Sequence, residues 1–114
     1  MHMKVLICGG RDFQDFELMS DVLEPIPISS VVQGGARGAD LLAAKWAESR
    51  RIPFRQHEAD WLQYGKRAGP MRNLQMLAEH PDIQLVIAFP GGKGTAHMVK
   101  IAKAAGIEVI EVPG

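Results

Sequence analysis

The chain has 114 residues, which is enough for one folded domain and too few for two. Of these residues 46% are hydrophobic and 23% are charged, a composition typical of globular proteins. Its 13 basic and 13 acidic residues give a formal net charge of zero, which counts against a dedicated nucleic-acid-binding surface. No apolar run approaches the ~18 residues of a membrane span, and the N-terminal run is too short for a signal peptide, so we expect a cytoplasmic protein without a membrane partner.

The one cysteine, Cys8, lies in an apolar run, which indicates a buried thiol and not a nucleophile. The four histidines, His2, His57, His80 and His97, are scattered, and no two have the spacing of metal ligands. We therefore expect no internal disulfide, no metal ion and no bound cofactor.

Apolar runs of strand length alternate with helical patterns along the whole chain. The strand-like runs, rich in valine and isoleucine, cover residues 3–10, 29–38, 52–59, 83–92 and 106–114. Helical patterns lie between them, at residues 14–23, 36–51, 69–79 and 94–105. With right-handed crossovers, this alternation predicts an α/β, Rossmann-like three-layer fold with a mostly parallel five-stranded sheet and about four helices. A single domain is expected over residues 1–114.

The third helical pattern has an apolar stripe formed by Met71, Leu74, Leu77 and Ala78. Residues at this spacing share one face of a helix. We therefore expect this face to turn toward the sheet.

Glycine pairs end three of the strand-like runs, at Gly9-Gly10, Gly34-Gly35 and Gly91-Gly92. In an open parallel sheet, ligands bind beyond the carboxyl ends of the strands, where the strand order reverses. Three glycine-rich turns at one edge exceed what packing requires, so the pattern predicts a ligand site there.

The first two turns carry charged candidates. In "GGRDF", Arg11 and Asp12 either point into the crevice or are solvated loop charge. In "GGARGAD", Gly34, Gly35 and Gly38 would let a ligand approach the backbone. Arg37 could bond a phosphate or carboxylate there, and Asp40 could accept ribose hydroxyls. The alternative is a tight turn in which Asp40 only favours the positive helix end.

The segment "DWLQYGKRAGPMRN", residues 60–73, is expected to be a loop that leads into a helix. Trp61 and Tyr64 are candidates for stacking on a base, and Arg72 and Asn73 for contacting the ligand. The alternative is that Trp61 packs over the sheet edge while the basic residues are solvated.

The last glycine-rich turn, "FPGGKGT" at residues 89–95, precedes a helix and predicts a phosphate site built on backbone amides. The lysine inside the glycine cluster departs from the Walker A pattern, and the dinucleotide fingerprint G-x-G-x-x-G is also absent. The candidate ligand-binding residues here are Pro90, Gly91, Gly92, Gly94 and Thr95.

Together, "GGRDF", "GGARGAD", "AGPMRN" and "FPGGKGT" resemble, in this order, the YspA-like, YpsA-related members of the SLOG superfamily. That superfamily also holds the lonely-guy phosphoribohydrolases and the DNA-processing proteins. The resemblance covers residues 3–112 and implies a Rossmann-like fold that binds a nucleotide or a nucleotide-derived molecule, such as an ADP-ribose-like signal. It implies phosphate contacts at residues 91–95, a facing loop at 34–40, and ligand contacts from Arg11 and Arg72. By analogy with lonely-guy dimers, it also implies a homodimer.

One departure from the resembling enzymes bears on catalysis. Lonely-guy enzymes resemble P-G-G-x-G-T-x-x-E, where the glutamate is placed to assist glycosidic cleavage. Here that position holds Met98, so the acid is missing. Asp40, Asp12 or Asp60 could supply a carboxylate from another loop, and His97 could act as a general acid.

The sequence leaves three functions open. The first is a nucleotide sensor or binding module without turnover. The second is a hydrolase that cleaves an N-glycosidic or phosphoanhydride bond of a nucleotide derivative, with Asp40, His97 and Asp12 as candidate catalytic residues. The third is a DNA-handling module, which the zero net charge disfavours.

Overall fold

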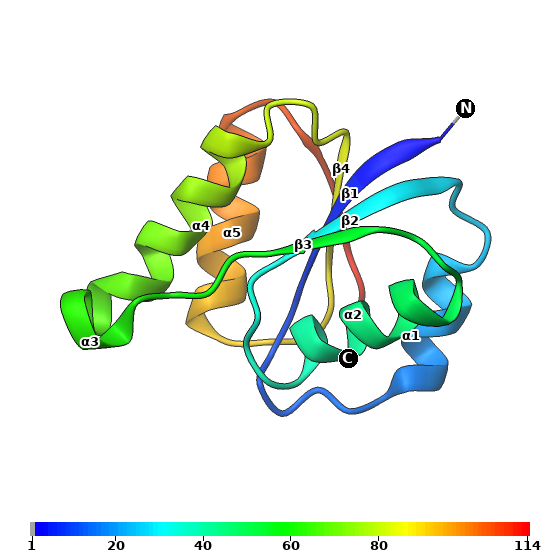
Figure 1. Cartoon of the computed structure of the whole chain (residues 1–114), viewed down its shortest axis with the longest axis horizontal. Coiled ribbons are helices and arrows are strands. Elements are labelled where there is room, and N and C mark those ends of the chain that lie inside the picture. The colour runs from blue at the N-terminus through cyan, green and yellow to red at the C-terminus, as the bar shows by residue number, and fades with distance from the viewer. Residues whose placement is uncertain (1) are drawn as a thin grey trace.

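Five strands form one sheet in the order β3-β2-β1-β4-β5, and each neighbouring pair is parallel (Figure 1). The computed structural model describes residues 2–114. The strands are β1 (Met3–Cys8), β2 (Ile28–Gln33), β3 (Phe54–Gln56), β4 (Leu85–Ala88) and β5 (Glu108–Glu111). The helices are α1 (Phe16–Leu23), α2 (Ala39–Ser49), α3 (Trp61–Tyr64), α4 (Ala68–Glu79) and α5 (Lys93–Ala104), with the 3₁₀ turn η1 (Gly65–Arg67) before α4. The predicted Rossmann-like α/β fold is confirmed.

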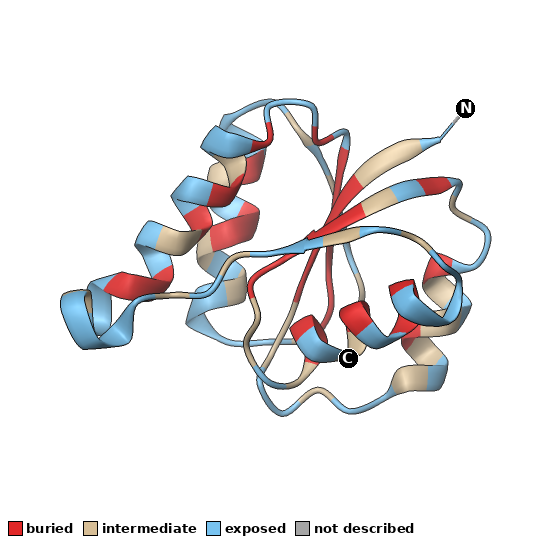
Figure 2. Ribbon diagram, in the orientation of Figure 1, coloured by how far each residue is buried: buried red, intermediate tan, exposed pale blue. Residues whose placement is uncertain are grey.

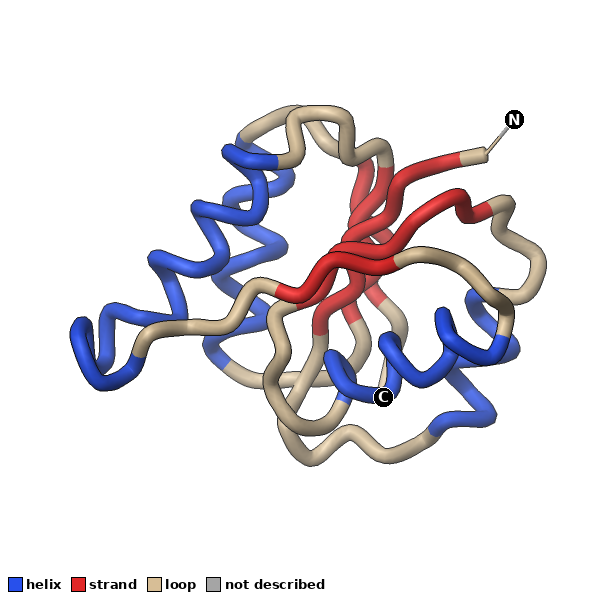
Figure 3. The backbone as a smooth tube through the Cα atoms, in the orientation of Figure 1, coloured by secondary structure: helices blue, strands red, loops and turns tan. Residues whose placement is uncertain are grey.

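Helices cover both faces of the sheet, α1 and α2 on one face and α4 and α5 on the other (Figure 3). Successive side chains of β1 point to opposite faces, so Val5 and Ile7 pack under α1 and α2 while Leu6 and Cys8 pack under α4 and α5. Both faces are therefore buried, which explains why the central strands read as continuous apolar runs (Figure 2). Within residues 2–114, none of the helices has the length and apolar character needed to cross a bilayer.

The strand order reverses at β1. From β1 the chain moves outward through β2 to β3, and it then crosses back to β4 and β5 on the other side. Cys8 at the end of β1 pairs with Ala88 at the end of β4, so the two following turns lie together. The Gly10 N–H donates to the Pro90 carbonyl oxygen at 2.8 Å. This is the edge at which parallel α/β sheets hold ligands.

Residues 61–64 form the short helix α3, where the sequence predicts a loop. The Asp60 carboxylate accepts a hydrogen bond from the Gln63 N–H at 3.1 Å, as a helix N-cap does. Gly65, with φ of 57°, ends the helix after one turn. An aspartate cap followed by glycine indicates a short helix in the sequence, but a single turn is too short to show the apolar periodicity of a helix.

Helix α4 turns a different face to the sheet from the one predicted. Met71, Leu74 and Ala78 are exposed, and of the predicted stripe only Leu77 packs against the core. Asn73 and Met76 are buried instead. The reason is a set of polar contacts: the Asn73 side chain bonds to the start of α5, so its face of the helix must point inward. The α4 sequence is apolar on both faces, and periodicity alone could not select the correct one.

The ends of β3 and α4 are joined by two histidines that are distant in the sequence. The Nε2 atoms of His57 and His80 lie 2.8 Å apart, and the rings meet edge to face. One ring must donate and the other accept, so the contact holds one proton between the two nitrogens. Burial lowers the pKa of His80 below its ordinary value of 6.5, and the positive charge of Lys4 and the His57 ring add to the effect.

This histidine contact predicts that the contribution of His80 to the stability of the fold is lost in acid. Because the pKa of His80 is lowered in the folded state, the unfolded chain binds the extra proton first, so the contribution to stability is present above about pH 6.5 and lost as the pH falls. The free energy of unfolding at pH 5 minus that at pH 7.5, measured by urea unfolding, should therefore be more positive for His80→Gln than for the unmodified chain. His2→Gln, at an exposed position, is the control. An unchanged pH dependence in His80→Gln would contradict this role.

Candidate functional site

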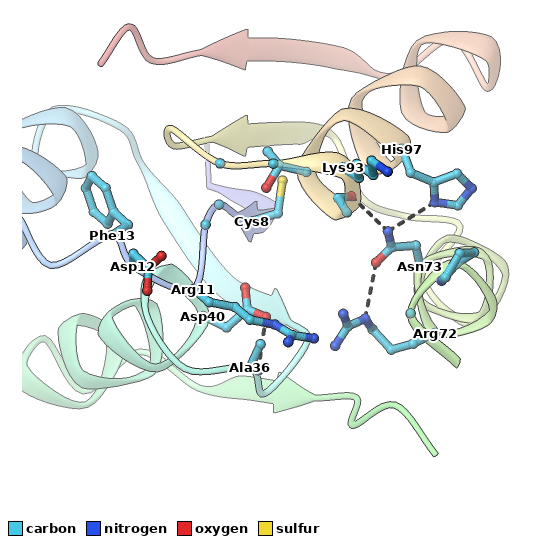
Figure 4. A pocket seen from close by; sticks show the side chains of 18 of the residues that line it. Cys8, Arg11, Asp12, Phe13, Ala36, Asp40, Arg72, Asn73, Lys93 and His97 are labelled. Atoms are coloured by element: carbon cyan, nitrogen blue, oxygen red, sulfur yellow. Dashed lines mark hydrogen bonds between the residues drawn. The ribbon is translucent and has the colours of Figure 1, made fainter. Parts of the chain in front are cut away.

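A cavity of about 940 Å³ opens at the carboxyl ends of β1 and β4 (Figure 4). The turn after β1, the start of α2, the α3–α4 segment and the turn before α5 together form its wall. The residues that the sequence predicted for the site and that line this cavity are Gly9, Gly10, Arg11, Asp12, Asp40, Trp61, Arg72, Asn73, Pro90, Gly91, Gly92, Gly94, Thr95 and His97. Four distant stretches of sequence therefore meet in one place.

The N-terminus of α5 presents free backbone donors to the cavity. The first hydrogen bond of this helix runs from the Ala96 N–H to the Gly92 carbonyl oxygen at 3.0 Å. The N–H groups of Lys93, Gly94 and Thr95 therefore precede the helical ladder and have no intrahelical acceptor. Such a helix start attracts anions, because the free N–H groups and the helix dipole both carry positive partial charge.

The glycines of this turn differ in what the fold requires of them. A Cβ atom at Gly91 would lie 2.6 Å from the Gly10 nitrogen, so this glycine lets two turns pack together. A Cβ atom at Gly92 or Gly94 would meet no atom within 4 Å, and neither residue has a positive φ. Neither packing nor a positive φ explains the missing side chain at Gly94.

Asp40 lies at the floor of the cavity with 6% of its surface exposed. Its Oδ2 atom accepts a hydrogen bond from the Ala36 N–H at 3.1 Å. Burial raises the pKa of Asp40 to about 6, even though the Ala36 bond and the charges of Arg72 and Arg11 pull in the opposite direction. A carboxyl group poised near neutral pH can accept hydrogen bonds from hydroxyl groups or exchange a proton.

A polar network links α4 to the turns on either side of the cavity. Arg72 Nη1 donates to the Gly34 carbonyl oxygen at 2.5 Å, and Arg72 Nε donates to Asn73 Oδ1 at 3.2 Å. An arginine can only donate, so the Asn73 amide nitrogen faces the other way, toward the Gly94 carbonyl oxygen at 3.2 Å and His97 Nδ1 at 3.1 Å (Figure 4). His97 Nδ1 is then an acceptor, and the proton of the neutral ring lies on Nε2.

Trp61 and Arg11 form one rim of the cavity. The Arg11 guanidinium lies over the Trp61 ring, 5.2 Å from its centroid, and Trp61 is 46% exposed. Trp61 also contacts Gly69 at the start of α4, where a Cβ atom would lie 3.3 Å from the indole. The ring is thus held at the rim while much of its surface stays open, as a stacking platform requires.

The other predicted residues lie outside the cavity lining: Gly34, Gly35, Arg37, Gly38 and Tyr64. Gly34 supports the floor, because a Cβ atom there would lie 2.9 Å from Asp40 Oδ2. Gly38 has a φ of 81° and its Cα faces the Gly10 carbonyl oxygen, so it joins α2 to the turn after β1. These two glycines therefore let the segments outside the cavity pack closely against the residues that line it. Arg37 lies in a smaller hollow next to the cavity.

Several lining residues were not among the sequence-predicted site residues: Cys8, Phe13, Gln14, Ala36, Lys66, Gly69, Pro70, Met76 and Lys93. Phe13 packs against Phe89 with ring centroids 5.1 Å apart and the rings tilted by 38°. Met76 lines the cavity because the face of α4 that carries Asn73 and Met76 points inward. Cys8 was expected to be buried, and it is; burial raises the pKa of its thiol to about 12, with Asp40 adding to the effect. The thiol is therefore protonated and unreactive at neutral pH.

The cavity is more positive than the chain as a whole. Its lining contains four cationic side chains, those of Arg11, Lys66, Arg72 and Lys93. Its two carboxyl groups belong to Asp12, which is paired with Arg37 at 3.2 Å, and to Asp40, whose pKa is raised. A chain with zero net charge thus gathers positive charge in the lining of this cavity. Within residues 2–114, no group of three histidine, cysteine, aspartate or glutamate side chains is placed to hold a metal ion.

Comparison with known proteins places the chain in a family. The model of the YspA, cpYpsA-related SLOG family matches residues 3–64. The chain belongs to this family. It is also similar to the Gene 61 protein of Mycobacterium phage D29, with 40% identity over an alignment of 119 positions that covers 94% of each chain. SLOG membership favours a nucleotide-related binding or processing role.

The SLOG match covers only part of the cavity wall. It includes the turn after β1, the start of α2 and the Trp61 segment, but it ends before α4 and α5. The free amides of α5 and the Arg72–Asn73–His97 network are therefore features of this structure that the family match does not describe.

Proposed function

We propose that the cavity binds a nucleotide or a nucleotide-derived molecule and that the chain acts as a sensor or binding module. The observation that carries this proposal is the start of α5, where free N–H groups stand beside Gly94, a glycine that neither packing nor a positive φ explains. The four cationic side chains of the lining add attraction for a phosphate or diphosphate.

The remaining contacts suit a nucleoside attached to that phosphate. Asp40 lies at the floor and can accept hydrogen bonds from ribose hydroxyls, and the exposed face of Trp61 at the rim can stack on a base. A volume of about 940 Å³ is at the upper end of the range for small-molecule sites, so a whole nucleotide fits.

A second candidate function is hydrolysis of an N-glycosidic or phosphoanhydride bond in the same ligand. The observation that favours it is Asp40, a buried carboxyl group whose pKa of about 6 suits proton transfer. Met98, which stands where the lonely-guy enzymes carry glutamate, is 1% exposed and packs in the core under α5, so that position presents no acid to the ligand. Asp40 and the Nε2–H of His97 would have to supply the acid and base.

A thermal-shift panel tests the proposed function. The ligands are AMP, ADP, ATP, ADP-ribose, cyclic ADP-ribose and NAD, with adenosine as the control that lacks phosphate. A ligand present at a hundredfold its dissociation constant should stabilise the fold by about 2.7 kcal/mol, which raises the melting temperature by on the order of 10 °C. Recovery of intact ligand by chromatography supports the binding module, and release of base or phosphate supports the hydrolase. No shift with any phosphorylated ligand would contradict both.

A further inference from the structure

A second hollow, of about 420 Å³, opens beside the cavity and is lined by Arg11, Ala36, Arg37 and Trp61. Three of these residues, Arg11, Ala36 and Trp61, line the cavity as well, so the two hollows share a wall. No residue of the turn at 90–97 lines the smaller hollow. It therefore lies at the Ala36 end of the site, away from the free amides of α5.

The smaller hollow contains two guanidinium groups. Arg11 is stacked on Trp61, and among residues 2–114 no carboxylate lies within ion-pair distance of it. Arg37 Nη2 is paired with Asp12 Oδ1 at 3.2 Å, but the two side chains are 71% and 95% exposed. An ion pair this exposed contributes little to stability, so an incoming anion can replace Asp12 at low cost.

We propose that this hollow, which we call the arginine subsite, binds a second anionic group of the same ligand. Guanidinium groups bind phosphate through paired N–H donors, and the Trp61 ring between the two hollows can cover the nucleoside that joins the two anions. This inference rests on the proposed function and narrows its ligand. The ligand class is a nucleotide with two separated anionic groups, one at the amides of α5 and one at Arg11 and Arg37.

The experiment measures dissociation constants by calorimetry for AMP and for adenosine 3′,5′-bisphosphate. The unmodified chain should bind the bisphosphate at least about tenfold more tightly than AMP. In Arg37→Gln, the affinity for the bisphosphate should fall by about tenfold while the affinity for AMP stays within about twofold. Arg51→Gln, which removes the same charge from an exposed residue outside both hollows, should change neither constant.

Two outcomes overturn the arginine subsite while leaving the proposed function intact. One is equal affinity of the unmodified chain for AMP and the bisphosphate. The other is a loss in Arg37→Gln that is the same for both ligands, or no larger than in Arg51→Gln. If the unmodified chain binds neither of these nor any ligand of the thermal-shift panel, the proposed function fails and the inference fails with it. Equal melting temperatures of the three free proteins exclude an effect of misfolding.

Discussion

Replacing Gly94 with alanine is expected to remove nucleotide binding without weakening the fold. Gly94 lies in the first turn of α5, and a Cβ atom there meets no other atom within 4 Å. Alanine favours helix over glycine by up to about 1 kcal/mol, so the free energy of unfolding should stay the same or rise slightly. The added methyl group occupies the space through which a phosphate oxygen would reach the amides, so affinity should fall by at least about tenfold.

Two companion variants separate this effect from a change in stability. Gly91→Ala should also lose binding, but it should unfold more easily, because its Cβ atom would lie 2.6 Å from the Gly10 nitrogen. Lys100→Ala, on the exposed side of the same helix, should alter neither property. Urea unfolding and calorimetry of all three proteins give the comparison. Retained affinity in Gly94→Ala would show that the ligand does not contact the start of α5.

Replacing Asp40 with asparagine is expected to stabilise the chain at neutral pH while it weakens ligand binding. Since burial raises the pKa of Asp40 from 3.8 to about 6, the stability contributed by its protonated form is present below pH 3.8 and lost as the pH rises through 6. Above pH 6, the buried charge lowers the free energy of unfolding by up to about 3 kcal/mol. Asparagine carries no charge and can still accept the Ala36 bond.

The expected gain in Asp40→Asn is therefore about 1–3 kcal/mol at pH 7.5 and near zero at pH 4, measured by urea unfolding. Affinity for a ribonucleotide should fall by about tenfold, whereas affinity for its 2′,3′-dideoxy analogue should change little, because only the former donates hydroxyl hydrogen bonds to Asp40. Asp21→Asn, an exposed acid on α1, is the control. A loss of stability at pH 7.5 would show that the charge of Asp40 stabilises the fold.

The fold was predictable because an apolar strand-like run followed by a helical pattern repeats along the chain. Continuous apolar strands such as β1 and β4 require a covered sheet, and the alternation with helices leaves few possible topologies. The face of α4 was not predictable in the same way. Its sequence has apolar residues on both sides, and the choice is made by Asn73, whose partners Gly94 and His97 come from α5. A contact between segments that are distant in the sequence cannot be detected from the spacing of apolar residues within one helix.

The candidate site could be located from the sequence but not assembled from it. Glycine pairs after β1, β2 and β4 mark the correct edge of the sheet, because carboxyl ends of parallel strands share that edge. The sequence could not show that Gly34 and Gly38 pack behind the cavity lining while Gly94 lines the cavity itself. That distinction depends on which atoms stand near each Cα. Nor could it pair Asp12 with Arg37 or place Arg11 over Trp61.

The most direct test of the central claim is an NMR titration of the ¹⁵N-labelled chain with AMP, followed through its backbone amide signals. If a phosphate binds at the start of α5, the amide signals of Lys93, Gly94 and Thr95 should shift most and should saturate along one binding curve. The same titration with adenosine should leave these three signals unmoved. Shifts confined to other parts of the chain, or no shift at all, would contradict a nucleotide site built on these amides.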